Sequence, residues 1–231
     1  MLPALLPLRA LCLAVAFSAC STPEPARSGG AGPAGGPNSA AASQSARDSA
    51  SILALADKGR IQGDSSAKLW LVIVSDFQCP YCRQWHDEVF ATVVRDYVTT
   101  GKVRIAYVNL PLSIHPNAVP AAEAAMCTSA QGRFWQMHDA LFRTQESWER
   151  LADPKPLFDS LAVSVGADPA AYRSCIQSRA TRPMIEADAR RVDDAGVRAT
   201  PTFFIGDTKL EGAVPLPEFR AALDRALAGA R

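Results

Sequence analysis

The sequence predicts one α/β domain with an inserted helical subdomain, behind an export signal and a flexible tether. Three observations lead to this fold class. A buried-type strand is followed by a helix and a second strand, then comes a long Ala-rich helical block, and a short strand pair with a last helix ends the chain. The 231 residues, 48% of them hydrophobic, are enough to bury a substantial core.

Hydrophobic periodicity and the positions of Gly and Pro place the individual elements. Lys68–Ser75 is β-branched and nearly all apolar, as in a strand covered on both faces, whereas Val103–Leu110 alternates as a second strand. Apolar residues at three- and four-residue steps from Trp85 to the stop at Gly101 predict a helix between them. Further helices are predicted over Ala121–Ala130, Phe134–Arg143, Lys155–Val165, Pro169–Arg179, Arg182–Ala195 and Leu216–Ala228, with strands near Thr200–Asp207 and Thr208–Leu210. The helical insert covers about residues 116–180.

Composition excludes two classes of protein. With 24 Lys and Arg against 23 Asp and Glu, the net charge of +1 provides no concentrated basic surface for nucleic acid. No apolar run reaches the ~18–20 residues that a membrane span requires, so a polytopic membrane protein is excluded.

The first 19 residues have the pattern of an export signal. Arg9 precedes the apolar run Ala10–Phe17, and small residues lead into Cys20. Phe17–Cys20 resembles a bacterial lipobox, which predicts lipidation of Cys20 and a lipid anchor to a membrane. The alternative is an ordinary secretory signal cut near Ala19, with Cys20 left as a spare thiol.

Residues 20–50 are predicted to be a disordered tether in front of a domain over residues 51–231. Of the thirty residues Ser21–Ala50, 23 are Ala, Ser, Gly or Pro. Such a segment buries too little apolar surface to offset the entropy lost on ordering.

Four of the six cysteines fall in the predicted domain, an even number that suits an exported protein. Cys79 and Cys82 form one CxxC, which leaves Cys127 with Cys175. The alternative for this second pair is two buried free thiols.

The CxxC stands where the first strand meets the helix. This position puts Cys79 at a helix N-terminus, where free N–H groups and the helix dipole favour the reactive thiolate, and Pro80 suits the first helical turn. We therefore expect Cys79 to be an exposed nucleophile and Cys82 a buried resolving thiol. A static disulfide and a zinc site are the competing interpretations; zinc lacks a second CxxC, and only His86 is near.

Three segments resemble DsbA-like thiol–disulfide oxidoreductases of the thioredoxin superfamily, over roughly residues 61–227. They are Ser75–Arg83, with its CPYC, Phe134–Phe142, and Gly196–Ile205. The resemblance implies a thioredoxin-like fold with the helical insert. It also implies a cis-proline at Pro201 beside the active-site sulfurs, a Thr200 backbone that pairs with substrate peptide, and a structural disulfide between Cys127 and Cys175.

One position departs from the family pattern. Many relatives place a buried carboxylate, a proton acceptor, six residues before the first cysteine, where this chain has Ile73. Asp76 is nearer in sequence, but its strand parity is opposite, so we do not transfer the role to it.

The expected function is disulfide formation in exported proteins that contain cysteines, through Cys79, Cys82 and the dipeptide Pro80-Tyr81. Alternatives are a reductase or isomerase of the same fold, or a non-catalytic binding module. We expect a monomer in the periplasm or cell envelope that needs no cofactor, metal or nucleic acid and that exchanges electrons with an unidentified membrane redox partner.

The remaining aromatic and histidine residues are predicted to be structural. Trp85, Phe90 and Tyr97 form a stripe typical of a core-facing helix. His86 is expected to pack on its helix face and His138 to be structural. His115 is expected in a loop before Pro116, with a role at the groove rim as an alternative.

Overall fold

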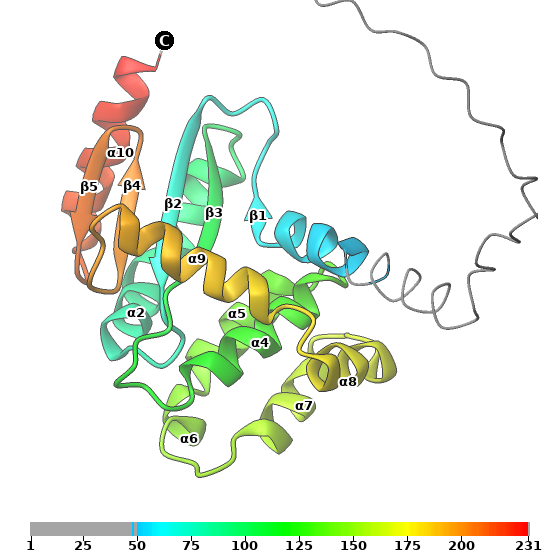
Figure 1. Cartoon of the computed structure of the whole chain (residues 1–231). Coiled ribbons are helices and arrows are strands. Elements are labelled where there is room, and N and C mark those ends of the chain that lie inside the picture. Colours follow the sequence, from blue (N-terminus) through cyan, green and yellow to red (C-terminus); the bar gives the residue numbers. More distant parts are fainter. Residues whose placement is uncertain (1–47, 49, 231) are drawn as a thin grey trace, which may run out of the picture.

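The computed structural model describes Asp48 and residues 50–230, and Figure 1 shows how their helices and strands are arranged. Within this part of the chain, five strands form one mixed sheet in the order β1-β3-β2-β4-β5. The bounds are β1 Ile61–Gln62, β2 Leu69–Ser75, β3 Val103–Asn109, β4 Thr202–Ile205 and β5 Thr208–Glu211. Strands β2 and β3 run parallel, and every other pairing is antiparallel. The α/β class predicted from the sequence is confirmed.

The segment before β2 differs from the expectation. Strand β1, which has two residues, was not predicted, because two residues carry no measurable hydrophobic period. Asp48 and residues 50–59 are helical, although the predicted tether extends to residue 50. This helix is held on the core by the fully buried Ala56, whose carbonyl accepts a 2.6 Å hydrogen bond from Ser129 Oγ. The predicted signal, most of the tether and Cys20 lie outside the described residues.

The two faces of the sheet pack against different helices. Ile73, Tyr107 and Phe203 point to the main core, which they share with α2 (Pro80–Trp85), α10 (Leu216–Gly229) and the helical insert. Val74 and its neighbours point to the other face, which α9 (Arg182–Asp194) covers through Val192. In Figure 1, α9 crosses in front of the sheet and α10 runs beside β4 and β5.

A long helix follows the CxxC but contains two π segments. Its parts are α2 Pro80–Trp85, η1 His86–Phe90, α3 Ala91–Val93 and η2 Val94–Val98. The Thr99 amide donates to the Val94 carbonyl five residues earlier, at 2.9 Å, as in a π turn. The predicted stripe is confirmed as core, since Trp85, Phe90 and Tyr97 are all at most 6% exposed. The π segments were not predicted, and the first of them begins at His86.

The helical insert consists of five helices packed on one another. They are α4 Ala118–Ser129, α5 Phe134–Arg143, α6 Gln145–Trp148, α7 Lys155–Ser164 and α8 Pro169–Ser178. Four of them match the prediction within three residues at each end, and α6, a single turn, was not predicted. A disulfide joins Cys127 of α4 to Cys175 of α8, with their Cα atoms 5.8 Å apart.

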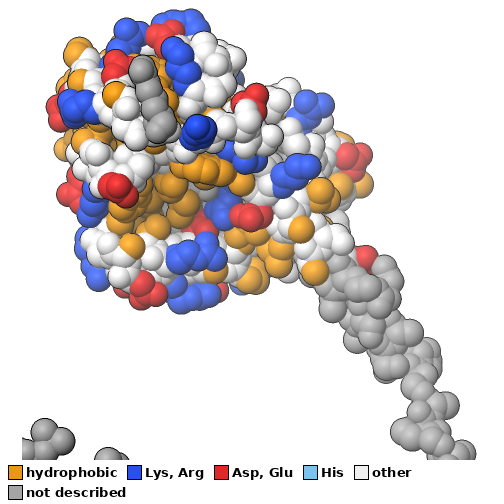
Figure 2. Space-filling view, turned by 90° about the horizontal axis from the view of Figure 1, so that it is seen from above, with side chains coloured by type: hydrophobic (Ala, Val, Ile, Leu, Met, Phe, Trp, Pro, Cys, Tyr) orange, Lys and Arg blue, Asp and Glu red, His pale blue; other side chains and the backbone are white. Residues whose placement is uncertain are grey.

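On the face shown in Figure 2, positive and negative side chains are mixed, as the net charge of +1 predicts. Figure 2 shows Lys and Arg side chains interspersed with Asp and Glu and with hydrophobic groups on the face in view. Among the described residues, no helix has the length and hydropathy needed to cross a membrane.

Candidate active site

The two CxxC thiols lie at the N-terminal end of α2, directly after the central strand β2. Cys79 is the N-cap residue, in an extended conformation, and Pro80 occupies the first helical position. Both cysteines are free thiols, and both are buried, with 3% of Cys79 and 2% of Cys82 exposed. The expectation of an exposed Cys79 is therefore wrong, because the loop before β4 covers its sulfur. Tyr81 is the exposed member of the motif, at 62%.

The covering loop contains a cis peptide bond between Thr200 and Pro201. The Cys79 Sγ atom lies 3.5 Å from the Thr200 carbonyl oxygen, to which the thiol donates. The buried Thr200 hydroxyl has no conventional hydrogen-bond partner among the described residues and interacts with the Cys79 sulfur. The loop thus supplies both an acceptor for the thiol and a donor for the thiolate.

Hydrogen bonding separates the two thiols in acidity. A hydrogen bond from the Cys82 thiol is the main cause that lowers the pKa of Cys79 to about 6, against the effect of burial. The Thr200 side chain and the amides at the start of α2 lower it further. Burial and the neighbouring Cys79 raise the pKa of Cys82 well above its usual value. The thiolate therefore forms at Cys79 first.

A buried carboxylate, Asp76, organises the loop between β2 and α2. Its side chain accepts hydrogen bonds from the Gln78 amide at 2.7 Å and the Leu112 amide at 2.9 Å, and it lies 2.7 Å from His115 Nδ1. Burial raises the pKa of Asp76, and these hydrogen bonds oppose the rise. His115, in the loop before Pro116, pairs with this carboxylate, so the pair joins the active-site loop to the segment after β3.

Amide side chains from the insert hold the same loop, and sequence reasoning missed them. Gln145 Nε2 of α6 donates to the carbonyls of Phe77 and Cys79, at 2.7 and 3.1 Å. Gln78 accepts from the Asn117 amide at 2.6 Å and donates to the Glu149 carbonyl at 2.7 Å. The only sequence signal is that Gln78 directly precedes the cysteine motif, because its partners lie 39 and 71 residues away.

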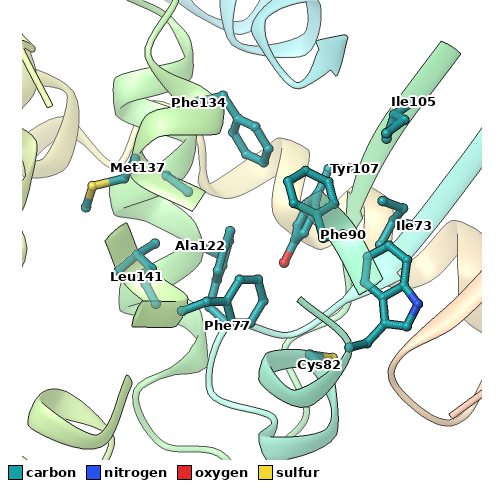
Figure 3. Packing of buried hydrophobic residues seen from close by; sticks show 14 of the residues in the cluster. Ile73, Phe77, Cys82, Phe90, Ile105, Tyr107, Ala122, Phe134, Met137 and Leu141 are labelled. Atoms are coloured by element: carbon teal, nitrogen blue, oxygen red, sulfur yellow. The ribbon is translucent and has the colours of Figure 1, made fainter. Parts of the chain in front are cut away.

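Ile73 occupies the position where a carboxylate was considered, and it packs in the main core at 2% exposure. Its partner across the β2–β3 ladder is Tyr107, whose buried hydroxyl has no conventional hydrogen-bond partner among the described residues. Figure 3 shows this hydroxyl directed toward Phe77 and Cys82. Burial raises the pKa of Tyr107 well above its usual value, and an interaction with Ser75 opposes this. Hydroxyls of Tyr107 and Ser75 thus lie near Cys82, where the Ile73 position offers no carboxylate.

A second cluster of polar side chains joins η1 to α5. His86, at the start of η1, meets His138 and Asp139 of α5, so three potential metal ligands lie close together. His138 is buried among aromatic rings, as its predicted structural role required. His86, expected only to pack on its helix face, also contacts Asp139.

The comparison with protein families matches residues 55–225 to the family model described as Thioredoxin. Among curated relatives, "Na(+)/H(+) antiporter NhaA 3" of Salinispora tropica is 34% identical over 76% of this chain and 26% of its own length. The chain thus spans about a quarter of the length of the antiporters that it matches. "Disulfide bond formation protein D" of Bacillus subtilis is 21% identical over 73% of this chain and 77% of its own length.

Solved structures show the same fold. Oxidised BdbD from Bacillus subtilis aligns with a TM-score of 0.67 and 23% identity, over 74% of this chain and 95% of that one. Wolbachia pipientis alpha-DsbA1 gives a TM-score of 0.66 and 24% identity, over 74% and 92%. A periplasmic thioredoxin-like protein from Salmonella enterica serovar Typhimurium gives 0.59 and 24%, over 78% and 96%.

Proposed function

This chain belongs to the thioredoxin family, and from that premise we propose that it is a DsbA-like oxidoreductase that forms disulfides in exported proteins through Cys79 and Cys82. One observation carries the proposal. The pKa of Cys79, the N-cap of α2, is lowered to about 6, while that of Cys82, the third residue of the helix, is raised. Because the two thiols differ in pKa, their roles differ: Cys79 is the sulfur that forms the bond with substrate, and Cys82 is the sulfur that is released from Cys79 or attacks it.

In the proposed reaction, a substrate thiolate attacks Cys79 Sγ of the oxidised pair. The Cys79–Cys82 bond breaks, a mixed disulfide forms, and Cys82 leaves with the electron pair and takes up a proton, as its high pKa requires. A second substrate thiolate then attacks the substrate sulfur of the mixed disulfide. The Cys79 thiolate departs, so the substrate gains a disulfide and the enzyme pair gains two electrons.

The stability of that thiolate supports the oxidising direction of electron flow. A hydrogen-bonded thiolate stabilises the reduced pair and makes the disulfide a stronger oxidant. This favours an oxidase over a reductase or isomerase. The reduced pair then requires an electron acceptor outside the chain, and we propose a membrane redox partner for that role.

We further propose that the chain works as a monomer outside the cytoplasm, anchored to a membrane by lipid on Cys20. The export signal pattern and the Cys127–Cys175 bridge support export, since such bridges persist in oxidising compartments. Labelling with a radioactive fatty acid tests the anchor, because Cys20→Ala should remove the label and release the chain from the membrane fraction.

Paired variants test the catalytic roles. Oxidised wild-type protein should oxidise a reduced dithiol peptide, whereas Cys79→Ser should reduce the rate to that of the uncatalysed reaction. Cys82→Ser, given the oxidised form of the same peptide, should attack the peptide disulfide through its Cys79 thiolate and accumulate mixed disulfides, which mass spectrometry detects. If mixed disulfides accumulate with Cys79→Ser and not with Cys82→Ser, the assignment is reversed.

A further inference from the structure

Two of the three histidines in the chain meet one carboxylate behind the active-site helix. His86 Nε2 lies 3.2 Å from Asp139 Oδ1, and His138 Nδ1 lies 2.9 Å from the same oxygen. One ligand atom from each of the three residues lies within 4.8 Å of the others. Because His86 comes from η1 and the other two from α5, the cluster bridges the active-site helix and the helical insert.

The spacing and the ligand types suit a zinc-class ion. Zinc is bound by His nitrogens and Asp oxygens at about 2.0–2.2 Å in a tetrahedron, whose corners are then about 3.4 Å apart. The separations of 3.2 and 2.9 Å in the structure are a few tenths of an ångström shorter, so an ion enters by a small spreading of the three side chains. Two imidazoles and one carboxylate are a ligand set typical of zinc sites with one open position.

The ring orientation of His86 provides independent support. Its other nitrogen, Nδ1, lies 2.9 Å from Asp87 Oδ1, on the side away from the cluster. A histidine that binds metal usually donates its second N–H to a carboxylate, which fixes the tautomer with the free lone pair toward the ion. Asp87 has the position that this arrangement requires.

A cavity gives an ion access to the cluster. It has a volume of about 590 Å³, and His86 and Asp139 lie in its wall together with Phe90, Val94, Trp135 and Arg143. The Asp139 side chain is 39% exposed, whereas that of His138 is 2% exposed. A metal here would have protein ligands on one side and the cavity, with room for water, on the other.

We propose that His86, His138 and Asp139 form a binding site for one Zn²⁺ ion, which fastens η1 to α5. The sequence alone predicted no metal site, because 53 residues separate His86 from Asp139. Among the described residues, none of the three ligands hydrogen-bonds to Cys79 or Cys82, and we assign the ion no part in thiol exchange. The proposal is therefore independent of the oxidase function, and either can fail without the other.

Zinc titration of the full chain tests the site, with Cys79–Cys82 oxidised and the remaining thiols alkylated so that no thiolate competes. Calorimetry should show one Zn²⁺ per chain, and the melting temperature should rise with zinc. Co²⁺ should bind with the visible spectrum of nitrogen and oxygen ligands and without a thiolate charge-transfer band.

Four variants complete the experiment. His86→Gln and Asp139→Asn should each weaken zinc binding by more than about 100-fold, and Asp87→Asn by about 10-fold. Glu88→Gln, an exposed neighbour on the same segment, is the matched control and should leave the affinity unchanged. His138 is left intact because its ring is part of the aromatic core. The proposal is overturned if the oxidised, alkylated wild type binds no zinc, or if binding survives both His86→Gln and Asp139→Asn.

Discussion

The two cysteine pairs of the domain are equally buried but lie at opposite ends of helices. Cys79 and Cys82 stand in the first turn of α2, while Cys127 and Cys175 stand in the last turns of α4 and α8. Free amides and the positive dipole end favour a thiolate at the first pair, and free carbonyls disfavour it at the second. The four residues are between 1% and 4% exposed, so burial does not distinguish them. The comparison teaches that the local hydrogen-bond donors, rather than exposure, decide which pair reacts.

The two cysteine pairs also differ in how far apart their members lie in the sequence. Two residues lie between Cys79 and Cys82, whereas the other pair is 48 residues apart and joins two helices of the insert. A bridge over a short segment constrains the unfolded chain little, and a long one constrains it strongly. One pair is therefore suited to exchange and the other to stability.

The largest expected effect comes from removing the long bridge. The Cys127→Ala/Cys175→Ala double variant should lose ~4 kcal/mol of unfolding free energy by the loop-closure relation, measured by denaturant titration. Its disulfide exchange at Cys79 should keep the wild-type rate. Graded reduction of the wild type, with mass mapping of alkylated thiols, should open Cys79–Cys82 first. Earlier opening of Cys127–Cys175 would contradict the comparison.

A smaller effect is expected on the melting temperature of the reduced protein when the pH changes. Because the pKa of Cys79 falls to about 6 in the fold, this thiol stabilises the reduced protein fully above its unfolded pKa of ~8.5, and the stabilisation is lost as the pH falls through 6. The melting temperature of the reduced form should therefore rise relative to that of the oxidised form from pH 6 to 8.5. The oxidised form, which has no titrating thiol in the pair, is the control.

The Thr200→Val variant tests how much the Thr200 hydroxyl contributes to the low pKa of Cys79. Loss of the hydroxyl that faces the Cys79 sulfur should raise the pKa of Cys79 by up to about one unit, or ~1.4 kcal/mol. The pH profile of Cys79 alkylation by iodoacetamide should move upward by the same amount. An unchanged profile would show that the Cys82 thiol and the helix amides are sufficient.

The smallest effect concerns the dipeptide between the cysteines. Tyr81 offers no cation to the Cys79 thiolate, so we expect a reduction potential on the order of −150 to −230 mV, measured in glutathione buffers by tryptophan fluorescence. Tyr81→His should make the pair more oxidising by only about 10–20 mV, since a charge at a site 62% exposed is screened by water. Tyr81→Phe is the control. A wild-type value near −270 or −120 mV would show that groups outside the dipeptide set the potential.

The features that the sequence predicted well depend on near neighbours. The apolar run of β2, the CxxC after it and the Pro80 start of α2 lie within one stretch of chain, so their periodicity and helix signals predict the strand, the helix and the thiol positions. The helix bounds in the insert follow from Gly and Pro residues in the same way. Local signals suffice there because the interactions that form these elements are local.

The features that only the tertiary structure decided depend on distant partners. Cys79 is buried because the loop at Thr200 folds over it from 121 residues away. Asp76 meets His115 across 39 residues, and Gln145 reaches the Cys79 carbonyl across 66. Side-chain hydrogen bonds of this kind leave no period in the sequence.

The histidine cluster could not be predicted from the sequence for the same reason, because its residues come from distant segments. The helical period after the CxxC assigns His86 to a face of its own helix, but it carries no information about Asp139 of α5, which lies 53 residues further along the chain. The sequence by itself determined the fold class, the redox motif and which elements carry it. Packing between segments far apart in the chain decided how the cysteines are covered, how the thiols differ in acidity and where the two histidines meet.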